Sequence, residues 1–375
     1  MVGVTIANNW DEQGYGPART GFEPNDDTLY NLVHPGKNIF VDLAWSYGTS
    51  SVVGTSPAVA DGVAYIGDNA GQLVAIDVHN GAPIWTWALP SGKAIGGSPA
   101  VDPLKQLVFV GADDGTLDAI STATGHLAWS ASIGGDLNAP SVALGDVYVS
   151  SSTGTVEAVS EATGARVWST KLASAVSAAP TVDTTAKILA VGEANGDVEA
   201  LNASTGAKVW SFAASGAVKA AVSISSGSVF FGSAGDEVYA VNESSGAKQW
   251  SYKTAGAVAD TPAVTNQITP GGVLEAIVGD SLGHLYFLVA STGKANYQVS
   301  YTGAVTGVVA VRGVAVAELS TGLITSTRTY TDLDVWKYQT SAGLTTVPVV
   351  DDGAIYVGAG DGHLYAFTSY GQPPS

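Results

Sequence analysis

The fold of this chain is decided by the stretch AISTATGHLAW, residues 119–129, because the same pattern returns along the whole sequence. The copies share an alanine at the start, a glycine in the middle and an aromatic residue four positions after that glycine, a pattern that blurs only in the last copies. The closing aromatic residues are Trp45, Trp85, Trp129, Trp168, Trp210, Trp250, Tyr297 and Trp336. Neighbouring members of this series are 39 to 47 residues apart. Such a period is typical of arrays of small structural units.

Each repeat has the pattern of short strands separated by turn residues. In the first repeat, apolar stretches cover residues 56–59, 63–67 and 73–77, and a fourth stretch contains Trp85. Asp-Gly and similar pairs separate the stretches, as in β-hairpins. Helical periodicity is absent from the repeats. Four short strands within about 40 residues are typical of one blade of a β-propeller.

The number of blades follows from the inner strands, whose predicted starts lie near residues 56, 98, 139, 179, 220, 261, 306 and 347. The last repeat ends without a tryptophan strand, whereas residues 42–48 supply one without inner strands. The sequence therefore predicts an all-β, eight-bladed β-propeller of four-stranded antiparallel blades over residues 41–375. Residues 42–48 complete the last blade, so the N-terminal strand closes the ring and leaves no free sheet edge. Residues 1–40 are expected to form an extension that packs on the propeller.

The eight aromatic residues of the series are assigned a structural docking role. An indole offers a large flat apolar surface that can pack between adjacent blades. The alanine at the start of the motif leaves room for it, and the glycine supplies the positive φ of a tight turn. The Asp, Asn or Ser two residues after the alanine can cap that turn.

Composition excludes several classes of protein. Charged residues make up 13% of the chain, against an average of roughly 25%. The net charge of −18 argues against a nucleic-acid partner. The chain has no cysteine, which excludes disulfides, thiolate metal sites and cysteine nucleophiles. No run of about 18 apolar residues is present, so no membrane-spanning segment is expected.

The expected location is outside the cytoplasm. The first residues, MVGVTIANNW, lack the basic start and long apolar stretch of a signal peptide. Few Lys and Arg residues and many Ser, Thr, Gly and Ala residues nevertheless favour a secreted, periplasmic or cell-surface protein whose signal has been removed. The low charge also fits an acidic habitat, because a Lys-rich chain would repel itself more strongly in acid.

The repeated unit A-x-[DNS]-x-x-[TSN]-G-x-x-x-W resembles the tryptophan-docking motif of quinoprotein-type propellers, the PQQ-like repeat family. The opening segment NNWDEQGYGPARTGFEPND, residues 8–26, is similar to the leader of secreted members. The resemblance implies one of several activities. The family includes quinone-dependent alcohol and sugar dehydrogenases, BamB-type scaffold proteins and acid-stable tetrathionate hydrolases. The vicinal cysteine pair of many dehydrogenases is impossible here, and their quinone- and calcium-binding Glu, Asn and Asp residues have no match in this sequence.

Candidate catalytic residues are sought at the channel mouth, just before each inner strand. Most residues there are small and uncharged, and the ionisable exceptions are Asp136, Lys219 and Asp260. In the functional interpretation, Lys219 contacts an anion or carbonyl and Asp260 acts as base or partner. In the alternative interpretation, the two form a solvated pair between neighbouring blades. Farther along, Glu318 is expected to face water at a strand end.

Two functions remain open. The first is a secreted, non-catalytic binding or scaffold module that is monomeric, has no cofactor and engages a protein or glycan. The second is an enzyme: a quinone-dependent dehydrogenase that uses PQQ with Ca²⁺ but lacks the cysteine pair, or an acid-stable hydrolase of the tetrathionate type. The five histidines lack the spacing of metal ligands, so no metal site is predicted.

Overall fold

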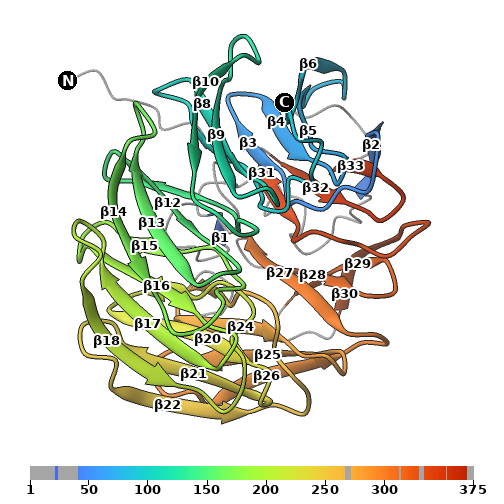
Figure 1. Ribbon diagram of the computed structural model, residues 1–375. Helices are drawn as coiled ribbons and strands as arrows, with labels where there is room; N and C mark the ends of the chain where they lie inside the picture. The colour runs from blue at the N-terminus through green and yellow to red at the C-terminus, as the bar shows by residue number, and fades with distance from the viewer. Residues whose placement is uncertain are drawn as a thin grey trace, which may run out of the picture.

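The computed structural model describes residues 22–23, 41–266, 272–311, 314–328, 333–351 and 353–369. Within these ranges the chain forms thirty-three β-strands arranged as eight sheets in a ring (Figure 1). The described residues contain no helix long and apolar enough to cross a bilayer. The predicted all-β, eight-bladed propeller is confirmed.

The strands of the first four blades, from the channel outward, are β3 (Ala58–Ala60), β4 (Val63–Gly67), β5 (Gln72–Asp77) and β6 (Pro83–Ala88); β7 (Ala100–Asp102), β8 (Leu107–Gly111), β9 (Thr116–Ser121) and β10 (Leu127–Ser132); β11 (Ser141–Ala143), β12 (Asp146–Ser150), β13 (Thr155–Ser160) and β14 (Arg166–Lys171); β15 (Thr181–Asp183), β16 (Ile188–Gly192), β17 (Asp197–Asn202) and β18 (Lys208–Ala213).

The strands of the last four blades, in the same order, are β19 (Ser223–Ser225), β20 (Ser228–Ser233), β21 (Glu237–Asn242) and β22 (Lys248–Lys253); β23 (Ala263–Thr265), β24 (Glu275–Gly279), β25 (His284–Val289) and β26 (Ala295–Ser300); β27 (Val305–Val311), β28 (Val314–Leu319), β29 (Leu323–Arg328) and β30 (Leu333–Gln339); β31 (Val349–Asp351), β32 (Ala354–Gly358), β33 (His363–Ser369) and β2 (Val41–Gly48).

The ring closes through the two ends of the described chain. Strand β2 pairs antiparallel with β33, and Trp45 lies opposite Ala366. The last blade therefore takes its outer strand from the N-terminal side, as predicted. The innermost strands contact one another in order around the channel, and β31 returns to β3.

The seventh blade departs from the expected four strands. The short strand β1 (Phe22–Glu23) pairs parallel with β27, which makes this sheet five-stranded. Figure 1 shows β1 inside the ring. The rest of the predicted extension, residues 1–40, lies outside the described residues.

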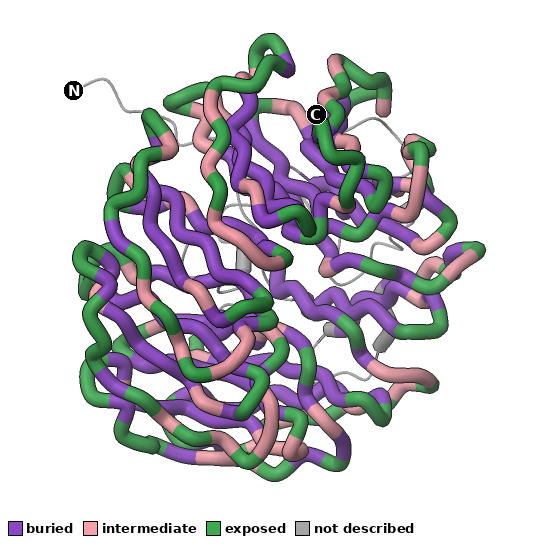
Figure 2. The backbone as a smooth tube through the Cα atoms, in the orientation of Figure 1, coloured by how far each residue is buried: buried purple, intermediate pink, exposed green. Residues whose placement is uncertain are grey.

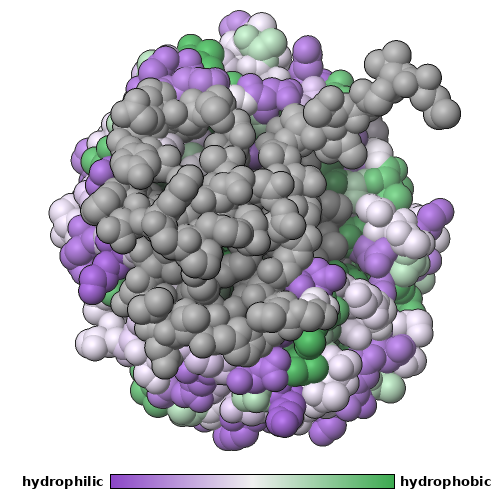
Figure 3. Space-filling model, turned by 180° about the vertical axis from the view of Figure 1, so that it is seen from behind, coloured by the Kyte–Doolittle hydropathy of each residue, from purple (hydrophilic) through white to green (hydrophobic). Residues whose placement is uncertain are grey.

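The core lies within and between the blades. The second and third strands of a blade are buried on both faces, which explains their nearly continuous apolar sequences, whereas side chains of the fourth strand alternate in exposure. In Figure 2 the purple of buried residues follows the middle of the blades, and green marks the turns and outer edge. Figure 3, the view from behind, shows hydrophilic and hydrophobic residues interspersed around that edge.

The tryptophans of the repeat join each blade to the next. The Nε1–H of Trp129, in the second blade, donates to the carbonyl of Glu161 in the third, with 2.9 Å between nitrogen and oxygen. The indole also lies against the motif glycine of the third blade, because a Cβ on Gly164 would come within 2.6 Å of the ring. An indole N–H also donates to a backbone carbonyl of the next blade from Trp45, Trp85, Trp168, Trp210 and Trp250.

Candidate functional site

A cavity of about 400 Å³ lies where the inner strands begin, at the mouth of the central channel. Its lining comes from all eight blades and consists mainly of glycine, alanine, serine and threonine. Lys219 and Asp260 are its charged or titratable lining residues, and Asn138 adds an amide. Asp136 is exposed and does not line the cavity. Its backbone N–H donates to Ser152 Oγ in the turn between β12 and β13.

Asp260 is buried, with 3% of its surface exposed. Its Oδ2 accepts the backbone N–H of Gly279 at 2.9 Å, at the end of β24. Its Oδ1 has no hydrogen-bond partner among the described residues. Burial raises the pKa of the Asp260 carboxyl to about 8, so this group is protonated at neutral pH.

In two other blades a threonine accepts the hydrogen bond that Asp260 accepts from Gly279. In the first blade Thr55 Oγ1 accepts the N–H of Gly67, and in the last blade Thr346 Oγ1 accepts that of Gly358, each at 2.9 Å. These glycines end the second strand of their blades, as Gly279 does. Asp260 thus occupies a position where a threonine performs the same structural task.

Lys219 is exposed at the mouth. Among the residues that the structure describes, no ion pair joins its ammonium group to Asp260, although both line the cavity. The mouth therefore presents one solvated cation and, separately, one buried carboxyl group. The predicted pairing of these two residues is not formed in the structure.

The other polar atoms at the mouth hold neighbouring blades together. Ser98 Oγ accepts the backbone N–H of Ser56, and Ser56 Oγ accepts that of Val347, both at 2.9 Å. The Asn138 amide donates to Ser150 Oγ and to the carbonyl of Val176. The bond from Asn138 to Ser150 lies within the third blade, and the others cross from one blade to the next. All of them consume hydrogen-bonding capacity that a catalytic site would need.

Glu318, in β28, corrects an expectation from the sequence. Its exposed fraction is 0%, and neither carboxylate oxygen has a hydrogen-bond partner among the described residues. Burial raises the pKa of this carboxyl well above its ordinary value. The prediction that Glu318 faces water was wrong. Glu318 stands near the end of the second strand of its blade, at the position that a glycine such as Gly67 occupies in other blades. The apolar residues on both sides of Glu318 were the sequence signal that this position is buried.

Two carboxyl pairs between blades were not found from the sequence. Burial, then the neighbouring carboxyl of Asp102, raises the pKa of Glu161 to about 7. Burial and the carboxyl of Asp183 do the same to Glu243. The backbone carbonyls of Glu161 and Glu243 also accept the indole N–H groups of Trp129 and Trp210. Only the register between repeats could have placed these side chains together.

Some of the described histidines have carboxylate neighbours. His284 Nδ1 lies 3.0 Å from Asp280 Oδ2, and His79 Nδ1 lies 3.0 Å from Asp77 Oδ1. Within the described ranges, one group of acidic side chains is close enough to share a cation, and it consists of Glu193, Asp197 and Glu199. None of these three lines the channel mouth.

A family model described as outer membrane protein assembly factor BamB matches residues 42–152, 87–180 and 152–368. Quinohemoprotein alcohol dehydrogenase of Comamonas testosteroni is 35% identical over 96 residues, which are 23% of this chain and 14% of the dehydrogenase. Outer membrane protein assembly factor BamB of Escherichia coli strain K12 is 28% identical over 113 residues, which are 26% of this chain and 28% of that protein. This chain thus matches less than a third of the length of these curated relatives.

The crystal structure of BamB from Moraxella catarrhalis superposes with a TM-score of 0.74 and 16% sequence identity. The superposition covers 88% of this chain and 100% of that one. At this identity the similarity concerns the fold alone.

Proposed function

The chain belongs to the BamB-like family of PQQ repeat propellers, and from this premise we propose that it is a secreted, non-catalytic binding and scaffold module. The observation that carries the proposal is the chemistry of the channel mouth. Its one carboxyl group, Asp260, is buried and bonded to Gly279, and its one cation, Lys219, has no acidic partner among the described residues. The described lining therefore holds no ion-paired acid and base, and its carboxyl group is already bonded to the backbone.

The quinone chemistry of the dehydrogenase relatives requires a different set of side chains. Pyrroloquinoline quinone is a tricarboxylate, and Ca²⁺ takes about six to eight oxygen ligands. The described lining offers one ammonium group and a carboxyl group that is protonated at neutral pH. These residues do not fit the quinone and its calcium ion, which supports a role in binding rather than redox turnover.

The chemistry of the mouth suggests what it binds. Lys219 stands in a ring of small neutral residues, so an incoming carboxylate would meet a cation without competing for it with a neighbouring acid. We propose that the partner is a protein that places an acidic side chain or its C-terminal carboxylate at this mouth. An acidic glycan is the second source of the same group. The enzyme alternatives, including the tetrathionate-type hydrolase, stay predictions without a supporting pair of residues.

Site-directed photo-crosslinking in the source organism tests this proposal. A photoreactive residue at position 219 samples the mouth, and one at Lys105, an exposed residue in the turn after β7, samples the other end of a blade. We expect a discrete adduct from position 219 and none from position 105. Absence of an adduct at 219, or the same adduct from both positions, contradicts binding at the mouth.

A further inference from the structure

Three acidic side chains converge on the hairpin between β16 and β17, in the fourth blade. The backbone N–H of Glu193 donates to the carbonyl of Asp197 at 2.8 Å, which closes the hairpin. Asp197 and Glu199 are two residues apart on β17, so their side chains lie on one face of the sheet. One carboxylate oxygen from each of the three lies within 4.8 Å of the others.

Two of these carboxylates are buried with an oxygen left unsatisfied. Glu193 is 0% exposed and Glu199 is 5% exposed. Glu193 Oε2 accepts the backbone N–H of Ser174, and Glu199 Oε1 accepts from Lys208 and Ser211. Glu193 Oε1 and Glu199 Oε2 have no hydrogen-bond partner among the described residues. A buried carboxylate oxygen without a donor is costly. The equivalent of Glu199 in the third blade, Glu157, also has an oxygen without a donor, so the oxygen that points to a missing positive group in this hairpin is Glu193 Oε1.

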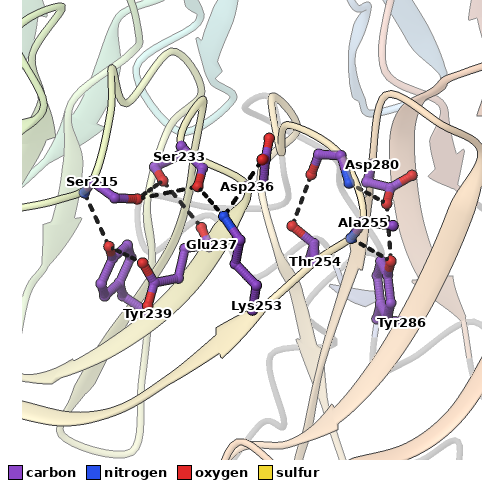
Figure 4. A network of polar contacts seen from close by, with 12 residues as sticks. Ser215, Ser233, Asp236, Glu237, Tyr239, Lys253, Thr254, Ala255, Asp280 and Tyr286 are labelled. Carbon is purple, nitrogen blue, oxygen red and sulfur yellow. Dashed lines mark hydrogen bonds and ion pairs between the residues drawn. The ribbon is translucent and has the colours of Figure 1, made fainter.

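The same three positions in the sixth blade show how a hairpin with a single acid is built. There the first position is Asp280, and the other two are His284 and Tyr286. Asp280 accepts from the Tyr286 hydroxyl at 2.9 Å (Figure 4). It also lies 3.0 Å from His284 Nδ1. One acid is thus surrounded by donors from its own blade, whereas in the fourth blade acids replace both donors.

The fifth blade is a second internal comparison. Glu237 and Tyr239 hold the last two positions, and the tyrosine hydroxyl donates to Glu237 Oε2 at 2.6 Å (Figure 4). The first position is Ser233, which carries no charge. Of these three hairpins, only that of the fourth blade brings three carboxylates together.

The charge of the cluster defines the missing group. The ammonium of Lys208 lies 2.7 Å from Glu199 Oε1, so the cluster would carry two uncompensated negative charges with all three carboxylates ionised. The ligands are all oxygen atoms, which suit hard cations rather than zinc or copper. We propose that Glu193, Asp197 and Glu199 bind one divalent cation of the calcium class, with water completing its coordination. This site lies on the fourth blade and is independent of the partner proposed for the channel mouth.

Calorimetric titration of the chelator-treated full chain with CaCl₂ tests the site. We expect one saturable site in the unmodified protein, and a rise in the melting temperature when Ca²⁺ is added. Asp197→Asn and Glu193→Gln keep the shape and polarity of the side chains but remove a charged ligand, so each variant is expected to weaken Ca²⁺ binding about tenfold or more. Circular dichroism of each variant verifies that it is folded.

The matched control lies in the third blade. Glu157 has the same position there as Glu199 and the same kind of partner, Arg166 at 2.7 Å, but Ser151 and Thr155 replace the other two acids. Glu157→Gln is expected to leave the Ca²⁺ affinity unchanged. The proposal is overturned if the unmodified protein gives neither saturable heat nor a shift in melting temperature, since the carboxylates would then share a proton instead. It is also overturned if Asp197→Asn and Glu193→Gln bind as the unmodified protein does, or if Glu157→Gln weakens binding equally.

Discussion

Trp129 and Glu161 are joined by a hydrogen bond that crosses from the second blade to the third, with 2.9 Å between the indole nitrogen and the backbone carbonyl oxygen. The side chain of the same glutamate shares its environment with Asp102 of the second blade. One residue therefore connects two blades through its backbone and through its carboxyl group. The contact repeats around the ring, so the stability of the propeller depends on a series of equivalent junctions.

Replacing this indole is expected to open one junction. Trp129→Ala removes a large ring and the hydrogen bond to Glu161, and we expect it to lower the free energy of unfolding by ~3–5 kcal/mol. Trp129→Phe keeps a smaller aromatic ring and loses the N–H donor, so its loss of stability is expected to be smaller than that of Trp129→Ala. Denaturant unfolding measures both. Leu104→Ala, at a position 92% exposed, serves as the control and is expected to change little. An unchanged stability of Trp129→Ala would refute the junction.

The motif glycine is expected to matter for two separable reasons. Gly164 has a φ of +69° and lies against the Trp129 ring, whereas Gly145 has a φ of +83° with open space where a Cβ would stand. Gly145→Ala adds only backbone strain, about 1 kcal/mol. Gly164→Ala adds a clash as well, and we expect about 1–3 kcal/mol beyond the strain. Thermal unfolding of the two variants compares them, and equal losses would mean that the indole does not constrain the glycine.

The buried carboxyl pairs are expected to make the propeller more stable in acid. The folded-state pKa values of Glu161 and Glu243 are raised to about 7. The contribution of these two groups to the free energy of unfolding is therefore fully present below the unfolded-state pKa of about 4.3, and it is lost as the pH rises through 7. The stability difference between the unmodified protein and the Glu161→Gln, Glu243→Gln double variant should thus fall between these pH values.

Glu237 provides a control with the opposite sign. The hydroxyl of Tyr239 lowers the pKa of Glu237, so its contribution is present above the unfolded pKa and is lost as the pH falls through the folded value. Glu237→Gln should therefore cost stability at neutral pH and less in strong acid. Melting temperatures measured from pH 3 to pH 9 distinguish the two cases. A pH-independent difference for the double variant would contradict the raised pKa values.

Two substitutions of Asp260 distinguish a structural role of its carboxyl group from a catalytic one. Asp260→Thr installs the residue that Thr55 and Thr346 provide in other blades, and it is expected to keep the bond to Gly279 and the stability of the protein. Asp260→Ala leaves the Gly279 N–H without its acceptor and is expected to cost about 1–3 kcal/mol. Chemical denaturation at pH 7 provides the comparison. If Asp260→Thr is no more stable than Asp260→Ala, the carboxyl group has a task that threonine cannot perform.

The fold could be predicted because each blade carries its own turn and strand signals. The Asp-Gly turn after β3 and the copies of the motif are local features, and the predicted inner strands begin one to three residues from the observed ones. The closing strand β2 was predicted by counting the strands of each repeat, because the last repeat lacked an outer strand and residues 42–48 supplied one. The parallel strand β1 had no such signal, because pairing with β27 joins segments far apart in the chain.

The site was less accessible to sequence reasoning. Counting back from the inner strands placed Lys219 and Asp260 at the mouth, where both lie, whereas Asp136 does not reach the cavity. The hydrogen bond from Gly279 to Asp260 depends on side-chain geometry that the repeat does not encode. Glu318 was placed in water because charged residues at strand ends usually are, and only the packing of the blade shows otherwise.

Calorimetric titration with pyrroloquinoline quinone, with and without Ca²⁺ at pH 4 and pH 7, tests the central claim about the channel mouth most directly. The described mouth carries one cation and a carboxyl group already bonded to Gly279, so we predict no saturable quinone binding under any of the four conditions. Saturable binding at one site, weakened by Lys219→Ala, would contradict the claim and place the protein among the quinone-dependent enzymes.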